Sequence, residues 1–489
     1  MDISKFLGDG QYILPDHPKL QYCGRIGRGN NGMPEFVYPC TFVKWRFKGR
    51  DASVILTSRR FYQDIYAGFI IDGHQYKMML NAGADGHSRD GYATERVSLL
   101  KDGKADERLI PVEYERILYS DERLIAAEYS RAFRADGKNM STGTDLFKEN
   151  CRTDATGAEP SVEIGPGNTD SVDFSGGIHQ ESEGRSEQHE TACRTNSDGS
   201  GLPENMEDIH EIVFFKRQDA MNVIEMGGIV LDTDAGLLEC DPLPVLKMEV
   251  YGDSVSAGEV SEALDCVAAP DPEGHEGKYS NSWYSYSWMT ARRLNARLHD
   301  IAQGGIALLD GTGWFSWPDF IGLESIYDKV RYYPELKNAT HWDFSKYIPD
   351  IVVIAVGQND ANPLDYMKMI REREAAAGSN GTALSDLPGK AGDYEDADLK
   401  AQCWKEHYRD FVLRIRGLYK EALIICATTI LNHDRAWDDV IEEVVAGLND
   451  PKVKHFLYTG NGCGTPGHIR IPEAERMSEE LAGFINSLL

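Results

Sequence analysis

A serine in a short glycine- and aspartate-containing segment is the first candidate for covalent chemistry in this sequence. Ser254 ends the tripeptide Gly-Asp-Ser soon after an apolar run at 245–250. A serine between a buried strand and a helix lies at the ligand edge of a sheet, where its backbone N–H can face an oxyanion. Ser256 stands where the G-x-S-x-G elbow of lipases has its second glycine, which disfavours an α/β-hydrolase. Taken alone, the tripeptide is more typical of an ordinary helix-capping turn.

Three other segments contain groups that could support nucleophilic catalysis by a serine. His468, in a Gly- and Pro-rich loop before the last expected helix, could act as the general base. Asn359 follows an apolar run at 351–356, and its side-chain amide could donate to a tetrahedral intermediate. A short strand ends at two adjacent glycines, of which we prefer Gly305 as a backbone donor. Each feature alone is commoner in ordinary loops, but the set, one at the end of each element, favours catalysis.

The second half of the chain has the pattern of a parallel sheet covered by helices. Short apolar runs alternate with helical spacing of apolar residues, which predicts buried strands at 245–250, 351–356, 422–426 and 453–457 and helices at 282–298 and 472–488. Ligands of such sheets bind beyond the carboxyl ends of the strands. All four candidate segments are expected at that edge.

The first half has the rhythm of a β-sandwich. Apolar and polar residues alternate at 41–47, and further strand-like runs occur at 53–57, 68–71, 108–112 and 210–217. Between them, 135–206 is rich in polar residues and glycine and predicts a flexible insertion. We therefore expect an N-terminal domain at 1–242, interrupted by this insertion, and a second domain at 243–489.

Composition narrows the class of partner. The 489 residues carry a formal charge of −28, which disfavours binding to nucleic acid or to anionic lipid and suits a neutral substrate. No window approaches the roughly 18 apolar residues of a membrane helix. Nine cysteines without a C-x-x-C pair argue against a zinc cluster and a disulfide framework. Without a recognisable secretory signal, we expect a cytoplasmic protein unless a leader has been removed. The oligomeric state is left open.

The candidate residues together resemble the four blocks of the SGNH (GDSL-like) hydrolase superfamily, from residue 247 to the C-terminus. The resemblance implies a three-layer α/β/α, flavodoxin-like domain with Ser254 as nucleophile and His468 as base. It also implies an oxyanion hole made of the Ser254 N–H, the Gly305 N–H and the Asn359 side chain. We expect such a site to need neither a metal ion nor an organic cofactor.

The first half is similar to the N-terminal jelly-roll of carbohydrate esterase family 2. The similarity rests on segments 23–26, 43–49, 71–73 and 213–217. It implies an acetyl esterase that deacetylates plant polysaccharides or their oligosaccharides through an acetyl-enzyme. Two alternatives remain open: an SGNH lipase or thioesterase, and a carbohydrate-binding protein whose esterase site has decayed.

The resemblance has one departure near the expected base. SGNH enzymes usually place an aspartate three residues before the catalytic histidine, where this sequence has Thr465. We therefore expect a Ser–His pair in which a backbone carbonyl, such as that of Pro466, accepts the second ring N–H. Loss of an orienting carboxylate can cost orders of magnitude in rate.

Four further residues are candidates for substrate contact. Trp314 and Trp317 could stack on sugar rings, and the equally weighted alternative is that they fill the interface between domains. Asp360, beside the expected oxyanion donor, and His433 are expected at the same sheet edge. For His433 and its neighbour Asp434, capping a loop is the favoured alternative.

Overall fold

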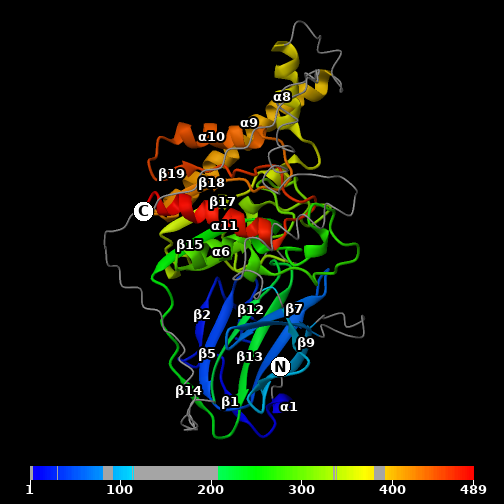
Figure 1. Cartoon of the computed structure of the whole chain (residues 1–489). Helices are drawn as coiled ribbons and strands as arrows, with labels where there is room; N and C mark the ends of the chain where they lie inside the picture. The colour runs from blue at the N-terminus through cyan, green and yellow to red at the C-terminus, as the bar shows by residue number, and fades with distance from the viewer. Residues whose placement is uncertain are drawn as a thin grey trace, which may run out of the picture. The chain divides into compact units, whose positions relative to one another are not determined.

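Two antiparallel sheets form the first half of the protein (Figure 1). The structure is a computed structural model that describes residues 4–29, 31–80, 92–112, 114, 208–333, 336, 339–378 and 391–489. A short helix, α1 (Ser4–Leu7), precedes them. The first sheet has the order β10 (Lys104–Ala105), β9 (Tyr92–Lys101), β6 (Ala52–Arg59), β13 (Val223–Leu231), β4 (Pro34–Phe36) and β3 (Gly27–Arg28), with β1 (Gln11–Ile13) beside β13. The second has the order β11 (Ile110–Pro111), β8 (His74–Leu80), β7 (Ile65–Ile71), β12 (Ile209–Lys216), β5 (Phe42–Lys48) and β14 (Gly236–Leu238), with β2 (Gln21–Cys23) beside β5. The predicted insertion at 135–206 lies outside the described residues.

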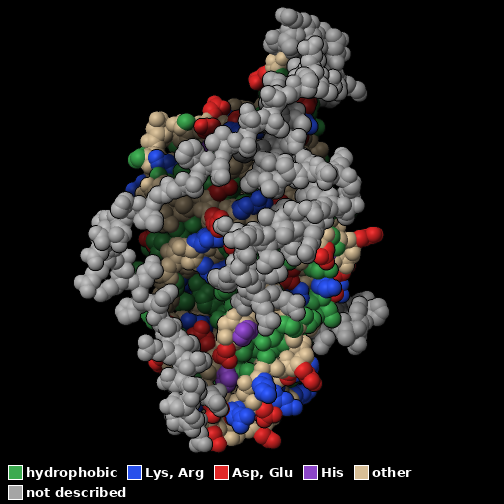
Figure 2. Space-filling view, in the orientation of Figure 1, with side chains coloured by type: hydrophobic (Ala, Val, Ile, Leu, Met, Phe, Trp, Pro, Cys, Tyr) green, Lys and Arg blue, Asp and Glu red, His purple; other side chains and the backbone are tan. Residues whose placement is uncertain are grey.

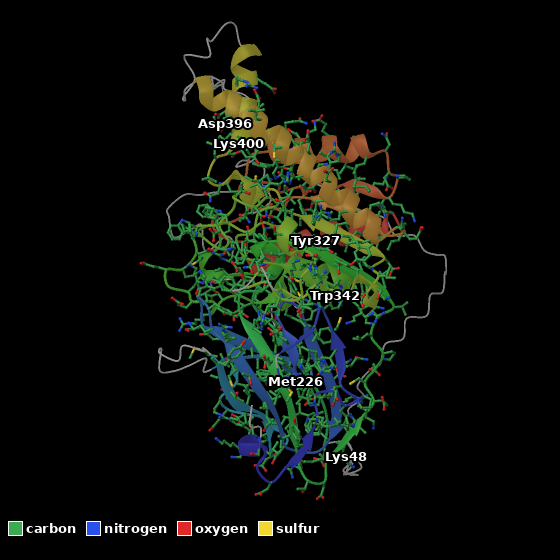
Figure 3. All side chains as sticks on the ribbon, turned by 180° about the vertical axis from the view of Figure 1, so that it is seen from behind. Lys48, Met226, Tyr327, Trp342, Asp396 and Lys400 are labelled. Carbon is green, nitrogen blue, oxygen red and sulfur yellow. The ribbon has the colours of Figure 1, made fainter. Side chains whose placement is uncertain are left out.

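The two sheets pack face to face around one apolar core. In β5, Val43, Trp45 and Phe47 are fully buried, whereas the residues between them are partly exposed, as the alternation at 41–47 predicts. Met226 of the opposite sheet, labelled in Figure 3, belongs to the same core. The strand expected at 108–112 is reduced to the two residues of β11. A β-sandwich in this half of the chain is therefore confirmed.

A five-stranded parallel sheet follows. Its order is β16 (Ala296–Ala302), β15 (Leu246–Gly252), β17 (Ile351–Ala355), β18 (Leu423–Ala427) and β19 (Val453–His455). The strands therefore lie in the order 2-1-3-4-5, and the order reverses between β15 and β17. In sheets of this kind the crevice beyond the strand ends at such a reversal is the usual ligand site.

Helices pack on both faces of this sheet. Val352 and Ile354 share a core with residues of α9 (Ala391–Leu418) and α10 (Ala436–Leu448), whereas Ile351 and Val353 share another with α6 (Tyr286–Arg293) and α11 (Ile471–Asn486). The other α-helices among the described residues after the sandwich are α5 (Ser254–Ala257), α7 (Leu323–Ile326) and α8 (Tyr366–Gly378). The single helix expected at 282–298 is wrong, because Asn295 adopts a left-handed conformation (φ +50°) after α6 and β16 begins at the next residue.

Arg25 joins the sandwich to the parallel sheet. It lies between β2 and β3, is fully buried, and forms an ion pair with Glu249 of β15 at 3.6 Å. Its guanidinium also donates to the Tyr327 carbonyl (2.5 Å) and lies 5.3 Å from the centre of the Trp342 ring; both residues are labelled in Figure 3. Because β15 leads into the segment of the candidate serine, this contact holds the sandwich against the strand that positions the site.

One described cysteine takes part in a disulfide, although the spacing of the cysteines predicts no disulfide framework. Cys463 is disulfide-bonded, and the other described cysteines are free. Disulfide formation depends on the distance between two cysteines in space, so isolated positions in the sequence do not exclude it. Cysteine spacing therefore gives no argument for a reducing compartment.

Among the described residues, no helix has both the length and the apolar character needed to cross a bilayer.

Candidate active site

Ser254 occupies the first turn after β15. Asp253 caps the short helix α5 by accepting the Val255 N–H at 3.0 Å, and the next residue, Ser254, is 4% exposed. The Ser256 hydroxyl lies so close to Gly252 that a Cβ there would meet it at 2.0 Å. Glycine before the serine is thus required by close packing within the turn itself. The candidate nucleophile lies on a tightly constrained strand-to-helix turn, at the sheet edge that the sequence predicts.

Asp253 connects this turn to the one that follows β17. Its carboxylate accepts from the Gln358 side chain at 2.5 Å and from the Asn359 side chain at 3.1 Å. Burial raises the pKa of Asp253 to about 6, although the hydrogen bonds from Val255 and Gln358 lower it. The structure therefore brings Ser254 and Asn359 to the same edge through a shared buried carboxyl group.

Asn359 uses its amide differently from the expectation. Besides the bond to Asp253, its Nδ2 donates to the Ile306 carbonyl at 2.9 Å. Both amide hydrogens thus have acceptors within the protein. To donate to an oxyanion, the Asn359 amide must exchange one of these acceptors for the developing charge.

The two glycines after β16 have different roles. The Gly304 N–H donates to Asp219 at 3.1 Å, so this donor is already in use. Gly305 has φ +70°, and its carbonyl accepts from the Trp314 N–H at 2.8 Å. A Cβ on Gly305 would lie only 2.9 Å from that of Trp314, so the close approach of this loop requires glycine. Of the two, Gly305 is the better candidate for an oxyanion donor.

His468 is oriented by a carboxylate that sequence analysis missed. Its Nδ1 donates to Asp271 at 2.6 Å, and Arg470 forms an ion pair with the same carboxylate at 3.0 Å. Gly467 makes room for it, since a Cβ there would meet the Asp271 oxygen at 2.6 Å. The prediction that the Pro466 carbonyl accepts the second ring N–H is therefore wrong. Asp271 stands 197 residues before the histidine, and no local spacing pointed to it.

Thr465, which replaces the usual aspartate, has a structural role. Its hydroxyl donates to Glu473 at 3.0 Å and accepts from the Ala268 N–H at 3.0 Å. Glu473 belongs to the first turn of α11, so Thr465 joins the histidine loop to this helix and to the segment that contains Asp271. Thr465, at the position of the usual aspartate, thus helps to hold the segment of Asp271 in place.

The second ring nitrogen of His468 faces another carboxylate. Nε2 lies 3.2 Å from Glu259, five residues after the candidate nucleophile. Burial lowers the pKa of His468, but hydrogen bonds to Asp271 and Glu259 outweigh this effect and raise it to about 10. At neutral pH the imidazole is therefore protonated. Its Nδ1–H donates to Asp271, and Nε2 forms an ion pair with Glu259. Glu259 was also missed by sequence analysis.

Backbone contacts hold the histidine loop against the segment that follows the serine. The Glu259 N–H donates to the Ser254 carbonyl at 3.0 Å, and the Ile471 N–H donates to the Ser261 carbonyl at 3.0 Å. The charge of His468 also lowers the pKa of Asp253, beside the serine, against the larger effect of burial. The structure thus groups the serine, histidine and asparagine segments at one sheet edge, as expected.

The candidate substrate residues divide into exposed and buried pairs. Trp314 and Trp317 are 64% and 79% exposed, so the alternative that they fill a domain interface is wrong. Asp360 is fully buried and accepts from the Leu308 N–H at 2.9 Å, and burial raises its pKa to about 7. The side chain of His433 is 1% exposed and contacts Asp438 at 3.0 Å. Both side chains are thus engaged with groups of the protein itself.

Asp434 has the capping role that the sequence favoured. Its carboxylate accepts from the Ala436 N–H at 3.0 Å and from Arg371 at 2.9 Å. These contacts stabilise the start of α10 and leave the carboxylate engaged.

In the part of the chain that the structure describes, no group of three or more His, Cys, Asp or Glu side chains is arranged to hold a metal ion.

Comparison with known proteins relates the first half to one family. The family model described as "Carbohydrate esterase 2 N-terminal" matches residues 22–101. The chain is 35% identical over 162 residues to the cellulase/esterase CelE of Acetivibrio thermocellus, covering 33% of this chain and 18% of that protein. It is 32% identical over 131 residues to an acetylxylan esterase / glucomannan deacetylase of Cellvibrio japonicus, covering 27% and 34%. The chain thus spans about a third or less of the length of these curated relatives.

Solved structures extend the likeness to nearly the whole chain. A family two carbohydrate esterase from Cellvibrio japonicus matches with a TM-score of 0.59 at 16% identity, over 98% of this chain and 97% of that one. Another from Clostridium thermocellum, in complex with cellohexaose, matches with a TM-score of 0.55 at 19% identity, over 96% and 99%. The resemblance to family two carbohydrate esterases is therefore confirmed, and the chain shares their fold.

Proposed function

We propose that this chain is a serine esterase that removes O-acetyl groups from neutral plant polysaccharides or their oligosaccharides. The observation that carries the proposal is the position of His468. A carboxylate orients its Nδ1, and its Nε2 contacts Glu259, whose backbone N–H donates to the Ser254 carbonyl. This arrangement is what a nucleophile and its base require. It occurs in a fold shared with carbohydrate esterases.

The proposal includes a finer description of the architecture. We assign 1–242 to a jelly-roll domain interrupted by an insertion, and 243–489 to a three-layer α/β/α, flavodoxin-like SGNH domain. The strand order 2-1-3-4-5 supports this assignment, because β15 and β17 flank the reversal that gives such domains their ligand crevice. Ser254 and Asn359 follow these two strands.

The proposed reaction begins with the Ser254 hydroxyl attacking the acetyl carbonyl. Its proton passes to Nε2 of neutral His468, while the N–H groups of Ser254 and Gly305 and the Asn359 amide stabilise the oxyanion. The intermediate collapses to acetyl-Ser254, and the sugar oxygen leaves with the proton from Nε2. Water then attacks the acetyl group by the same route and releases acetate. Throughout, Asp271 holds the Nδ1–H and so keeps the ring in the required tautomer.

Surface chemistry supports a neutral carbohydrate as the substrate. The formal charge of −28 disfavours polyanions. Figure 2 shows acidic and basic side chains side by side on the visible face of the sandwich. Trp314, whose backbone N–H donates to the Gly305 carbonyl, has an exposed indole that can stack on a sugar ring beside the reacting acetyl group. The relatives named above include an acetylxylan esterase / glucomannan deacetylase.

An assay of acyl chain length tests this function. We expect the protein to release acetate from acetylated xylan and glucomannan oligosaccharides and to hydrolyse aryl acetates faster than aryl octanoates. A preference for the long acyl chain would favour the lipase or thioesterase alternative. Sugar binding with no hydrolysis of any ester at any pH would favour the decayed carbohydrate-binding protein.

Replacement of Trp314 with alanine tests the sugar contact. We expect KM for an acetylated oligosaccharide to rise about 10-fold with kcat little changed, which corresponds to ~1.4 kcal/mol of lost binding. Alanine keeps the Cβ that packs beside Gly305, so the rate with a small aryl acetate should not change. Leu399→Ala, which alters a 71% exposed side chain on α9, is the control. Equal KM values for wild type and Trp314→Ala would remove this residue from the substrate site.

A further inference from the structure

Glu259 is held rigidly beside the candidate base. Its backbone N–H donates to the Ser254 carbonyl, and its carboxylate lies against Gly304, where a Cβ would meet its oxygen at 2.3 Å. A carboxylate in such a position cannot move freely. Its contact with His468 at 3.2 Å is therefore a feature of a packed site and not of a mobile surface side chain.

A buried polar network from the sandwich extends to this carboxylate. Asp219, which contacts Glu259, also accepts from Tyr62 at 3.0 Å and from Gln303 at 2.6 Å. Lys216, at the end of β12, donates to the carbonyls of Gln218 and Asp219 and is fully buried. Burial, together with the charge of Glu259, raises the pKa of Asp219. Burial raises the pKa of Glu259, but the interaction with His468 and, to a smaller extent, the hydrogen bond with Asp219 lower it. Glu259 is therefore negatively charged where it faces the imidazole.

The geometry points to competition for one nitrogen. In the proposed reaction Nε2 of His468 must accept the Ser254 proton, yet in this structure Nε2 is paired with the Glu259 carboxylate at 3.2 Å. We propose that Glu259 is a positioning residue that holds the Nε2–H of His468 in the resting enzyme and so sets the lowest pH at which the esterase works. This inference rests on the proposed esterase function.

The proton balance of the step is simple. The protonated imidazole loses its Nε2 proton to solvent or buffer and keeps its Nδ1–H on Asp271. The neutral Nε2 then has a lone pair that the Glu259 carboxylate repels, so the ring is free to turn toward the serine hydroxyl. Below the pKa of His468 the ring remains charged and cannot accept the serine proton, so activity rises with pH.

Several charged groups surround His468, and each affects the same equilibrium. Asp271 and Arg470 face its Nδ1 side, and Glu259 and Asp253 face it from the segment around α5. Further groups act through Glu259 and its neighbour: Asp219, Lys216, His275 and Tyr62. Among these, Glu259 is the carboxylate that touches Nε2, the nitrogen that the reaction uses.

Glu259→Gln tests the inference, because it removes the negative charge and keeps the shape of the side chain. We expect the acidic limb of kcat/KM against pH, measured as acetate release, to move down by about 1–3 pH units. Asp219→Asn is the matched control: it alters a buried carboxyl group of the same network that does not touch the imidazole, and it should move the limb by less than half as much. An unchanged limb in Glu259→Gln, or an equal shift in Asp219→Asn, would overturn the proposal.

A second measurement does not depend on activity or on a variant. In an NMR titration of the wild-type protein with labelled histidine, we expect His468 to titrate well above the ordinary value of about 6.5. Titration at or below that value would overturn the role of Glu259. If the wild type releases no acetate at any pH while His468 titrates high, the esterase function fails and the contact with Glu259 stands.

Discussion

Ser254→Ala is expected to lower kcat for acetate release by about 10⁴-fold to 10⁶-fold, the scale on which loss of a serine nucleophile acts. The variant lacks the hydroxyl that forms the acetyl-enzyme but keeps the Asp253 cap and the α5 turn. Its affinity for an acetylated xylooligosaccharide, measured by calorimetry, should stay close to that of the wild type. Initial-rate assays of acetate release provide the comparison.

Ser256→Ala is the matched control for this variant. The Ser256 hydroxyl is buried, contacts the Tyr286 hydroxyl at 2.9 Å and lies two residues from the candidate nucleophile. Its loss should change kcat by less than about 10-fold, because one neutral hydrogen bond contributes about 1 kcal/mol. If Ser254→Ala released acetate at the rate of Ser256→Ala, Ser254 would not be the nucleophile.

The second large effect is expected at Asp271. Asp271→Asn keeps the size of the side chain but can present an N–H to Nδ1, which favours the wrong tautomer of His468. We expect kcat to fall by about 10⁴-fold with KM little changed, as for a carboxylate that orients a catalytic histidine. Steady-state kinetics with an acetylated oligosaccharide and an aryl acetate should show the same loss, since the defect lies in the base and not in sugar binding.

Glu273→Gln is the control for the charge change in that loop. Glu273 is exposed and lies two residues after Asp271, so its neutralisation should leave the rate within about 2-fold, the scale of a surface charge effect. Retention of more than a tenth of the wild-type kcat in Asp271→Asn would mean that another group orients the ring. Asp271 would then not be the substitute for the aspartate that SGNH enzymes usually have three residues before the histidine.

The sequence predicted the features that depend on residues close together in the chain. Alternation in Val43, Trp45 and Phe47 predicted a half-buried strand, because successive side chains of a strand point to opposite faces. Apolar runs predicted the parallel strands β15, β17 and β18 for the same local reason. The segment of Ser254 at the sheet edge followed from its place directly after such a run. The helix expected at 282–298 failed because a local conformational break at Asn295 outweighed helical spacing.

Tertiary structure alone decided the electrostatic state of the candidate base. The sequence by itself placed Ser254 and His468 at strand and loop ends, since local patterns carry that information. The two carboxylates on the imidazole, Asp271 and Glu259, come from loops that pack together only after the sheet has formed. Hydrogen bonds and burial depend on distances between groups remote in sequence, so neither the partner of Nδ1 nor the raised pKa of His468 could be derived from spacing.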